Sequence, residues 1–308
     1  MNVQPVYVDP RCKIPYYTYL LEGLDAAGLD WKFRRLDAPV GAGMAIHHQS
    51  TRIWVDTDDM AHVDESAYNW ADRVGKVNVL LEDLQAYPKI VPLGPVFGIR
   101  CWQRAQCFGA FLAVVAHGVR PRAAISALRF QAKAREGIEA YFPVHTSSGT
   151  VFHRSRPWSG RHSGTNDARA RFATAAENAN VLTDISFAAS RISLAEYLER
   201  LRTSSVAFNS PAVHQCLGWK LGEYLAMGKA IISTDLAQHA LPAPLVHGQH
   251  VHFVDDDVES MRAAIVRIDQ DDEYRRRLER GSREWFEDHL APRRVIERLL
   301  KSDCTRGG

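Results

Sequence analysis

HQCLGWKLGEYLAMGKAIIST, residues 214–234, is the stretch of sequence that decides the fold of this chain. Its apolar residues recur at helical spacing and predict a helix over Leu217–Met227 that buries one face. Gly228 then fits the left-handed residue that commonly ends a helix. The apolar run Ala230–Ser233 is typical of a buried strand. A helix, a tight turn and a buried strand together form one repeat of an α/β sheet protein.

Lys220 and Glu223 lie on a second face of this helix because they are three residues apart. They fall in its first half, where free backbone N–H groups and the helix dipole can hold an anion. A lysine there suits a phosphate, and a carboxylate one turn on can accept hydrogen bonds from two neighbouring hydroxyls, as in a ribose. The alternative is an ordinary ion pair on the surface of an amphipathic helix, which is common and weak.

The same alternation of strands and helices extends back to the N-terminus. The predicted strands of the first half are Val3–Asp9, Trp31–Leu36, Arg52–Asp56, Lys76–Leu80 and Lys89–Pro92. Its clearest predicted helices are Tyr16–Ala27 and Gln103–Gly118, and the second is so apolar that we expect it to be buried. Short apolar strands between helices favour a parallel sheet that is covered on both faces.

The second half repeats this pattern after a change of composition near Phe142–Gly149. Its predicted strands and helices are Thr150–His153, Thr165–Glu177, Val181–Thr183, Leu194–Thr203, Val206–Asn209, His252–Val254 and Val258–Asp269, followed by a charged helical region over Glu273–Leu300. The 308 residues suit two domains, which we place at 1–145 and 146–308. Two such domains bind ligands at the carboxyl ends of their strands, and the cleft between them is the expected site.

The segment WKLGEYLAMGKAIIST, residues 219–234, resembles the donor-site segment of GT-B glycosyltransferases related to glycosyltransferase family 4 (glycosyl transferases group 1). Residues 247–290 resemble the same family's run of glycine loop, strand, acidic turn and two helices. The resemblance covers about residues 150–292. It implies a GT-B fold, in which two Rossmann-like domains face each other across a cleft. The N-terminal domain would then serve the acceptor and the C-terminal domain the nucleotide sugar.

The resemblance also implies roles for individual residues. Glu223 matches the second glutamate of the family motif, which binds the ribose of the nucleotide, and Lys220 would lie near the diphosphate. The first glutamate of the motif falls at Gln215, which can hydrogen-bond a sugar hydroxyl but carries no charge. Arg154 and Arg156 follow the first strand of this domain, where the family places a basic residue on the donor diphosphate.

The arginine-rich run that contains them, SGTVFHRSRPWSGRHSGTNDARARF, spans residues 148–172. Arg161 and Arg169 are further candidates for a diphosphate, because a guanidinium group pairs with phosphate oxygens through two bonds. The alternatives are a solvated basic loop and an RNA-binding patch, although only Phe152 and Trp158 interleave with the arginines.

Asp56 and Asp58 close the predicted strand Arg52–Asp56 and are our candidate catalytic residues. At a strand end they could act as a general base for an acceptor hydroxyl. Alternatives are a Mg²⁺ site or an acidic helix cap. The resemblance argues against a metal, since GT-B enzymes generally work without one. The tract His247, His250 and His252 suggests zinc or, as we expect, a loop above the donor site.

Composition limits the partners and the cellular compartment that we expect for this chain. A net charge of +2 gives no reason to expect nucleic acid as a partner. Five scattered cysteines favour a reducing compartment, and the N-terminal residues do not form a signal peptide. We therefore expect a cytoplasmic protein and consider a peripheral membrane contact, of which the pattern gives no direct sign. Phosphate-loop, GxGxxG, GxSxG and HExxH motifs are absent.

The sequence thus predicts a hexosyltransferase-like glycosyltransferase of polysaccharide biosynthesis that needs no cofactor. It would transfer a sugar from a nucleotide-diphosphate donor to a hydroxyl of a glycan, a lipid-linked sugar or a small molecule. The alternatives are a sugar-nucleotide epimerase and a non-catalytic binding module of the same fold.

Overall fold

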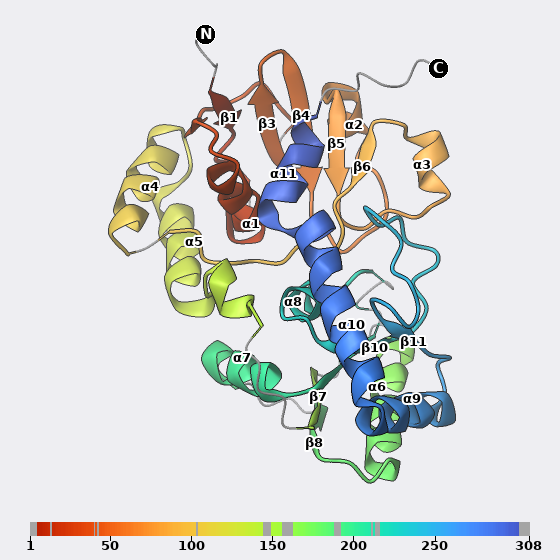
Figure 1. Ribbon diagram of the computed structural model, residues 1–308. Helices are drawn as coiled ribbons and strands as arrows, with labels where there is room; N and C mark the ends of the chain where they lie inside the picture. Colours follow the sequence, from red (N-terminus) through yellow and green to blue (C-terminus); the bar gives the residue numbers. More distant parts are fainter. Residues whose placement is uncertain are drawn as a thin grey trace. The chain divides into compact units, whose positions relative to one another are not determined.

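The computed structural model describes residues 5–12, 14–39, 41, 43–102, 104–143, 149–155, 163–187, 192–210, 212 and 216–301. The chain divides into two compact units, each with its own sheet (Figure 1). Unit 1 consists of Met1–Gly137 and His289–Gly308, and unit 2 of Ile138–Asp288. The prediction of an α/β protein with two sheet-containing domains is confirmed.

Unit 1 holds a six-stranded mixed sheet in the order β2-β1-β3-β4-β5-β6. Its strands are β1 Val6–Val8, β2 Trp31–Phe33, β3 Met44–His48, β4 Thr51–Asp56, β5 Arg73–Lys76 and β6 Ile90–Pro92. Strand β3 is antiparallel to both of its neighbours, so the expectation of a purely parallel sheet is wrong here. It forms a hairpin with β4 around Gln49, whose φ is 55°. The sequence shows no Asn-Gly or Asp-Gly turn at this point, so this strand was not predicted.

The helices of unit 1 are α1 Ile14–Ala26, α2 Glu65–Trp70, α3 Asp83–Ala86, α4 Arg104–Ala116, α5 Pro121–Ala134 and α11 Pro292–Leu300. Helix α11 lies beside α1 (Figure 1). The two approach closely at Gly23, where a side chain would lie 2.4 Å from the carbonyl oxygen of Pro292. The apolar stripe of α11 is fully buried, and it consists of Val295, Ile296 and Leu299.

The predicted second domain, 146–308, includes helix α11, whereas the structure places this helix in unit 1. The last helix belongs to unit 1, because the face of α1 offers its apolar stripe a place to be buried. The hydroxyl of Tyr19 strengthens the attachment by donating to the carbonyl of Leu290 at 2.5 Å. The other boundary lies after Gly137 rather than at residue 145.

Unit 2 holds a five-stranded sheet in the order β11-β10-β9-β7-β8, and every strand pair in it is parallel. Its strands are β7 Val151–Ser155, β8 Thr183–Phe187, β9 Val206–Asn209, β10 Ala230–Ser233 and β11 His252–Phe253. The predicted parallel sheet is confirmed in this unit. From β7 the chain adds β8 on one side and then β9 on the other. The strand order therefore reverses between β7 and β9.

The helices of unit 2 are α6 Ser163–Asn178, α7 Leu194–Thr203, α8 Trp219–Ala226, α9 Val258–Gln270 and α10 Asp272–Trp285, with a 3-10 turn at Ile138–Tyr141. A π turn at Phe286–Leu290 crosses the boundary to unit 1. The core lies between the sheet and helices α6, α9 and α10. At its centre the rings of Phe172 and Phe208 stack at 4.0 Å. Both rings are fully buried, so they fix α6 against β9.

Local signals in unit 2 explain where its helices begin and end. Ser193 caps α7 by accepting from the Glu196 N–H at 3.1 Å, and Asp257 caps α9 by accepting from the Ser260 N–H at 2.8 Å. Gly228, after α8, has a φ of 60°, as its sequence position predicts.

Gly281 of α10 provides a test of this packing. Substituting Gly281→Ala is expected to lower the free energy of unfolding by about 1–3 kcal/mol, because the new Cβ would lie 2.1 Å from the carbonyl oxygen of Gln249. The matched control is Gly109→Ala in α4, where no atom lies within 4 Å of an added Cβ. That change should raise stability by up to about 1 kcal/mol. Denaturant unfolding measures both changes in stability. Equal unfolding midpoints for the two variants would contradict the close packing of Gly281 against Gln249.

Candidate functional site

The carboxyl ends of β7 and β9 form the switch point of the unit 2 sheet. Strand β7 ends at Ser155 and β9 at Asn209, which Ser210 follows. In an open parallel sheet the crevice outside these strand ends binds ligands, because the flanking connections run to opposite faces of the sheet. Two helices, α6 and α8, supply basic side chains at this place.

Lys220 is the first of these side chains. It lies in the first turn of α8, and its ammonium donates to the carbonyl of Arg154 in β7. Burial and, to a lesser extent, the positive charge of Arg169 lower the pKa of Lys220 to about 8, although Glu223 partly opposes both. The α8 N-cap is Gly218, which has no side chain to satisfy the first N–H groups of the helix. An anion beside Lys220 would stabilise both the ammonium and this helix start.

Arg169 of α6 is the second cation, and only 8% of its surface is exposed. Its Nε donates to the Ser210 hydroxyl at 3.2 Å, which holds the guanidinium group at the end of β9. Burial lowers the pKa of Arg169. Two cations that repel each other in a buried place favour a negatively charged ligand, which would compensate both.

His153, one residue before Arg154 in β7, is a third titratable group near Lys220 and Arg169. It is 1% exposed, and its Nε2 lies 2.9 Å from the Ser155 hydroxyl. Burial moves the pKa of His153 well below its usual value, and the charges of Lys220 and Arg169 act in the same direction. The imidazole is therefore neutral near physiological pH and adds no third positive charge.

Glu223 is 6% exposed and lies one turn after Lys220 on α8. The hydroxyl of Tyr197, from α7, donates to its Oε2 at 2.9 Å. Burial raises the pKa of Tyr197, and so does the negative charge of Glu223. The predicted pair of a cation and a carboxylate on one face of this helix thus belongs to a largely buried group and not to an exposed surface.

The main-chain carbonyl and the side chain of Arg154 contact different residues. Its carbonyl accepts from Lys220, while its guanidinium group pairs with Asp184 of β8 at 3.2 Å. Asp184 also binds Arg200 at 3.2 Å. The structure therefore places the Arg154 main chain beside Lys220, and Glu223 on one helix with Lys220, but it directs the Arg154 guanidinium group to Asp184.

Three further predicted residues, Arg156, Arg161 and Gln215, lie outside the described residues.

Asp56 and Asp58 belong to unit 1, where Asp56 is the last residue of β4 and Asp58 lies two residues beyond it. Both Asp56 carboxylate oxygens are in use: Oδ2 accepts from the buried Lys76 ammonium at 2.6 Å, and Oδ1 accepts from the Asp58 N–H at 2.8 Å. Asp58 is exposed, and its Oδ1 accepts from the N–H of Asp59. Of the two, Asp58 is the more accessible to another molecule.

The histidine tract is used for local structure. The Nδ1 atoms of His247 and His250 accept from the N–H groups of Phe253 and Val246. The Nδ1 of His252 lies 2.6 Å from the Tyr274 hydroxyl. Within the described part of the chain, no group of three or more His, Cys, Asp or Glu side chains is arranged to hold a metal ion.

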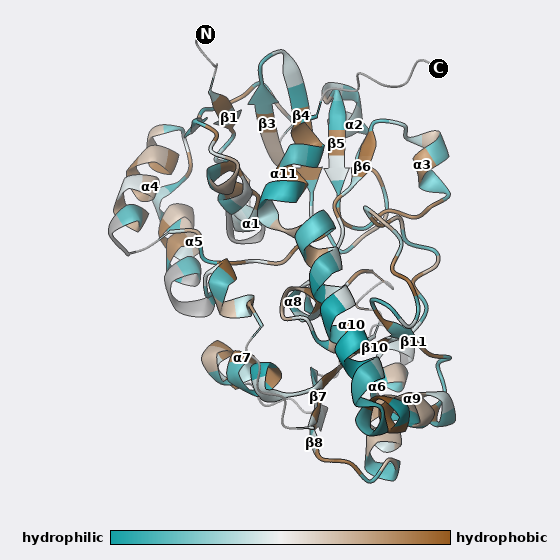
Figure 2. Cartoon of the chain, viewed as in Figure 1, coloured by the Kyte–Doolittle hydropathy of each residue, from teal (hydrophilic) through white to brown (hydrophobic). Residues whose placement is uncertain are grey.

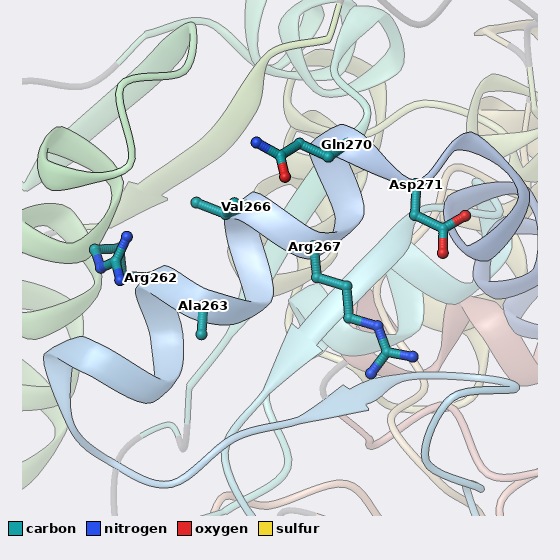
Figure 3. Close-up of a pocket in the computed structure, with 6 residues that line it drawn as sticks. All are labelled: Arg262, Ala263, Val266, Arg267, Gln270 and Asp271. Carbon is teal, nitrogen blue, oxygen red and sulfur yellow. The ribbon is translucent and has the colours of Figure 1, made fainter.

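A surface hollow also lies along α9 (Figure 3). The side chains that line it are Arg262, Ala263, Val266, Arg267, Gln270 and Asp271. All of them come from this helix and the residue after it, so the hollow gathers no groups from separate elements. A second hollow is bordered by Arg277, whose Nε already donates to the carbonyl of Gly248. Each hollow is lined by two arginines of a single helix, whereas the cations at the switch point come from two helices, α6 and α8.

Sequence reasoning missed the residues that surround Lys220 and Glu223. It ranked Arg169 below Arg154, and it did not include Tyr197, His153 or Ser210. Thr165 and Arg169 are four residues apart, and this spacing could have indicated that they share one face of α6. Both reach the segment after β9, since the Thr165 hydroxyl donates to the Ala212 carbonyl at 3.1 Å.

Comparison with known families finds no family profile and no curated protein that matches the chain. Solved structures do match. One is a glycosyltransferase from Rickettsia africae, at 10% identity and a TM-score of 0.43, covering 94% of this chain and 82% of that one. The second is S. aureus MnaA with UDP, at 10% identity and 0.40, covering 95% and 92%.

A third match is the C-terminal domain of the glycosyl transferase group 1 family protein LpcC from Francisella tularensis. It is 12% identical with a TM-score of 0.34, and the match covers 49% of this chain and 95% of that domain. Likeness at this level does not assign an activity to the chain.

Proposed function

We propose that this chain is a glycosyltransferase, with a hexosyltransferase-like reaction, that transfers a sugar from a nucleotide-diphosphate donor to a hydroxyl acceptor. One observation carries the proposal. Lys220 and Arg169 lie at the switch point of a parallel sheet, and the carboxylate of Glu223 lies one turn beyond Lys220. Cations followed by a carboxylate match the order of groups in a nucleotide, a diphosphate and then a ribose with two neighbouring hydroxyls.

In this proposal Lys220 and Arg169 bind the diphosphate at the start of α8, where the positive end of the helix dipole also favours an anion. The negative charge that grows on the leaving diphosphate is stabilised by these fixed cations, so the reaction requires no metal. Glu223 accepts from the ribose hydroxyls, and Tyr197 holds its carboxylate in place. We assign Arg154 and Arg156 to the diphosphate and Gln215 to the sugar, as the motif implies.

On the acceptor side we propose Asp58, rather than Asp56, as the general base. Both carboxylate oxygens of Asp56 already accept hydrogen bonds, one from Lys76 and one from a backbone N–H, whereas Asp58 is exposed. A sugar or a lipid-linked sugar is the proposed acceptor, within a cytoplasmic pathway of polysaccharide synthesis.

A non-catalytic module that binds nucleotide sugars is the second candidate. It is favoured by the internal bonds of the site: Lys220 donates to a carbonyl, Arg154 pairs with Asp184, and Glu223 accepts from Tyr197. Product analysis with a radiolabelled donor separates the candidates. A transferase moves label to an acceptor, an epimerase changes the sugar without one, and a module leaves the donor intact.

The proposal predicts that a nucleotide sugar raises the thermal unfolding midpoint. Donor at about 100 times its Kd should add about 2.7 kcal/mol to the free energy of unfolding, because it binds only the folded chain. A thermal-shift panel of UDP-, GDP- and ADP-sugars measures this, with the free sugars as controls. A panel in which no nucleotide shifts the midpoint would refute the proposed function.

A further inference from the structure

The outer face of α4 is apolar and exposed. Phe108 and Leu112, four residues apart on this face, are 66% and 51% exposed, while Val114 on the inner face is fully buried. This contradicts the expectation that the helix is buried on all sides. Figure 2 shows α4 mostly in pale to brown tones, whereas α10 is mostly teal. A helix that is apolar on both faces normally has both faces covered.

The neighbouring helix α5 places arginines beside this apolar face. Arg122, Ile125 and Arg129 follow one another at spacings of three and four, so they share one exposed side of α5. Arg120 is exposed in the connection between the two helices, which pack against each other. Among the described residues, none of these three arginines forms an ion pair with an acidic side chain. We call these residues, with Phe108 and Leu112, the α4–α5 surface.

The segment of sequence that contains the α4–α5 surface carries charge of one sign. Residues 84–135 contain eight Lys and Arg side chains, of the 38 in the chain, and none of the 36 Asp and Glu. The chain as a whole is nearly neutral at +2, so the positive charge is concentrated in this segment. A concentration of this kind attracts an anionic surface.

We propose that the α4–α5 surface docks on an anionic phospholipid bilayer. Phe108 and Leu112 enter the boundary between headgroups and acyl chains, and Arg120, Arg122 and Arg129 bind lipid phosphates. Helix α4 has 13 residues, so it is about 20 Å long and lies in the interface rather than crossing it. No helix in the described part of the chain is long and apolar enough to span a membrane. This inference goes beyond the proposed function and does not depend on it.

Two other occupants fit less well. A nucleic acid would pair with the arginines but would leave Phe108 and Leu112 uncovered, since its outer surface is charged. A second copy of this chain would bring identical patches together across a two-fold axis. The same arginines would then face one another without acidic partners.

Flotation of the full chain with lipid vesicles tests this inference. The chain should float with vesicles that contain about one third phosphatidylglycerol and much less with pure phosphatidylcholine, and added salt should weaken the binding. The double substitution F108S/L112S should reduce partitioning to the anionic vesicles at least about tenfold. R122Q/R129Q should reduce it about tenfold and remove the preference for anionic lipid.

Matched controls come from unit 2. L182S removes an apolar side chain that is 69% exposed, and R276Q/R280Q removes two exposed arginines, so both should bind vesicles as the unchanged chain does. All substitutions are at exposed positions, and unchanged thermal midpoints should verify the fold. The inference is overturned by equal binding to neutral and anionic vesicles, by no binding to either, or by F108S/L112S binding like the unchanged chain. A dimer in solution that F108S/L112S dissociates would assign the surface to a second copy instead.

Discussion

Replacing Glu223 by alanine is expected to weaken the binding of nucleoside diphosphates about a hundredfold. A hydrogen bond to a charged group contributes about 1.5–3 kcal/mol, and the ribose donates two of them in the proposed complex. A loss of about 2.7 kcal/mol corresponds to this factor. The buried position of Glu223, at 6% exposure, strengthens the effect because water replaces the lost partner poorly.

Isothermal titration with UDP, GDP and ADP measures this change. The substitution also removes the acceptor of the Tyr197 hydroxyl, so the titration belongs well below the unfolding midpoint. Glu199→Ala is the matched control, because its carboxylate is 64% exposed and pairs with Arg202 on the surface of the same unit. Unchanged affinity of the Glu223 variant for all three nucleotides would show that Glu223 does not bind the ribose.

Replacing Lys220 by methionine is expected to weaken nucleotide binding by about 10- to 100-fold, since it removes a charged donor to the diphosphate. The unchanged chain should also bind less tightly as pH rises. Lys220 has a pKa of about 8, so it carries its charge below that value and loses it above. Affinity should therefore be greatest near pH 7 or below and fall about tenfold by about pH 9.

Affinity measured across this range in the unchanged chain and in Lys220→Arg separates Lys220 from its neighbours. An arginine stays charged, so the variant should bind with a flatter pH profile. His153 does not contribute, because its pKa lies well below this range and it stays neutral throughout. A variant profile that falls as steeply as that of the unchanged chain would assign the titration to another group.

The elements of unit 2 were largely predictable from the sequence, and several of those of unit 1 were not. Leu194–Thr203, Val206–Asn209 and Ala230–Ser233 have the predicted bounds to the residue. Ser193 caps the helix, and the two strands are short, fully buried and mostly apolar runs. Strand β3 was missed because its hairpin turns at Gln49, a residue type with no turn preference. The sequence of helix α4 did not indicate which face is buried, because apolar residues occur on all sides of the helix.

The candidate site shows the same division. The spacing of Lys220 and Glu223 was sufficient to place them together on α8. Arg169 and Tyr197 reach the same place from α6 and α7, and no short-range pattern connects those helices to α8. The guanidinium group of Arg154, which the motif assigns to a phosphate, pairs instead with Asp184, a residue of the neighbouring strand.

By itself, the sequence determined two α/β halves, the parallel sheet of the second half, and a cation and a carboxylate on one helix. These depend on interactions within a few residues, where the spacing of side chains follows directly from the geometry of helix and strand. Only the tertiary structure decided that α11 packs on the first unit, that Arg169 joins Lys220, and that Phe108 and Leu112 face outward. Each of these depends on which distant segment covers a given face, and burial of that kind is decided by the whole fold.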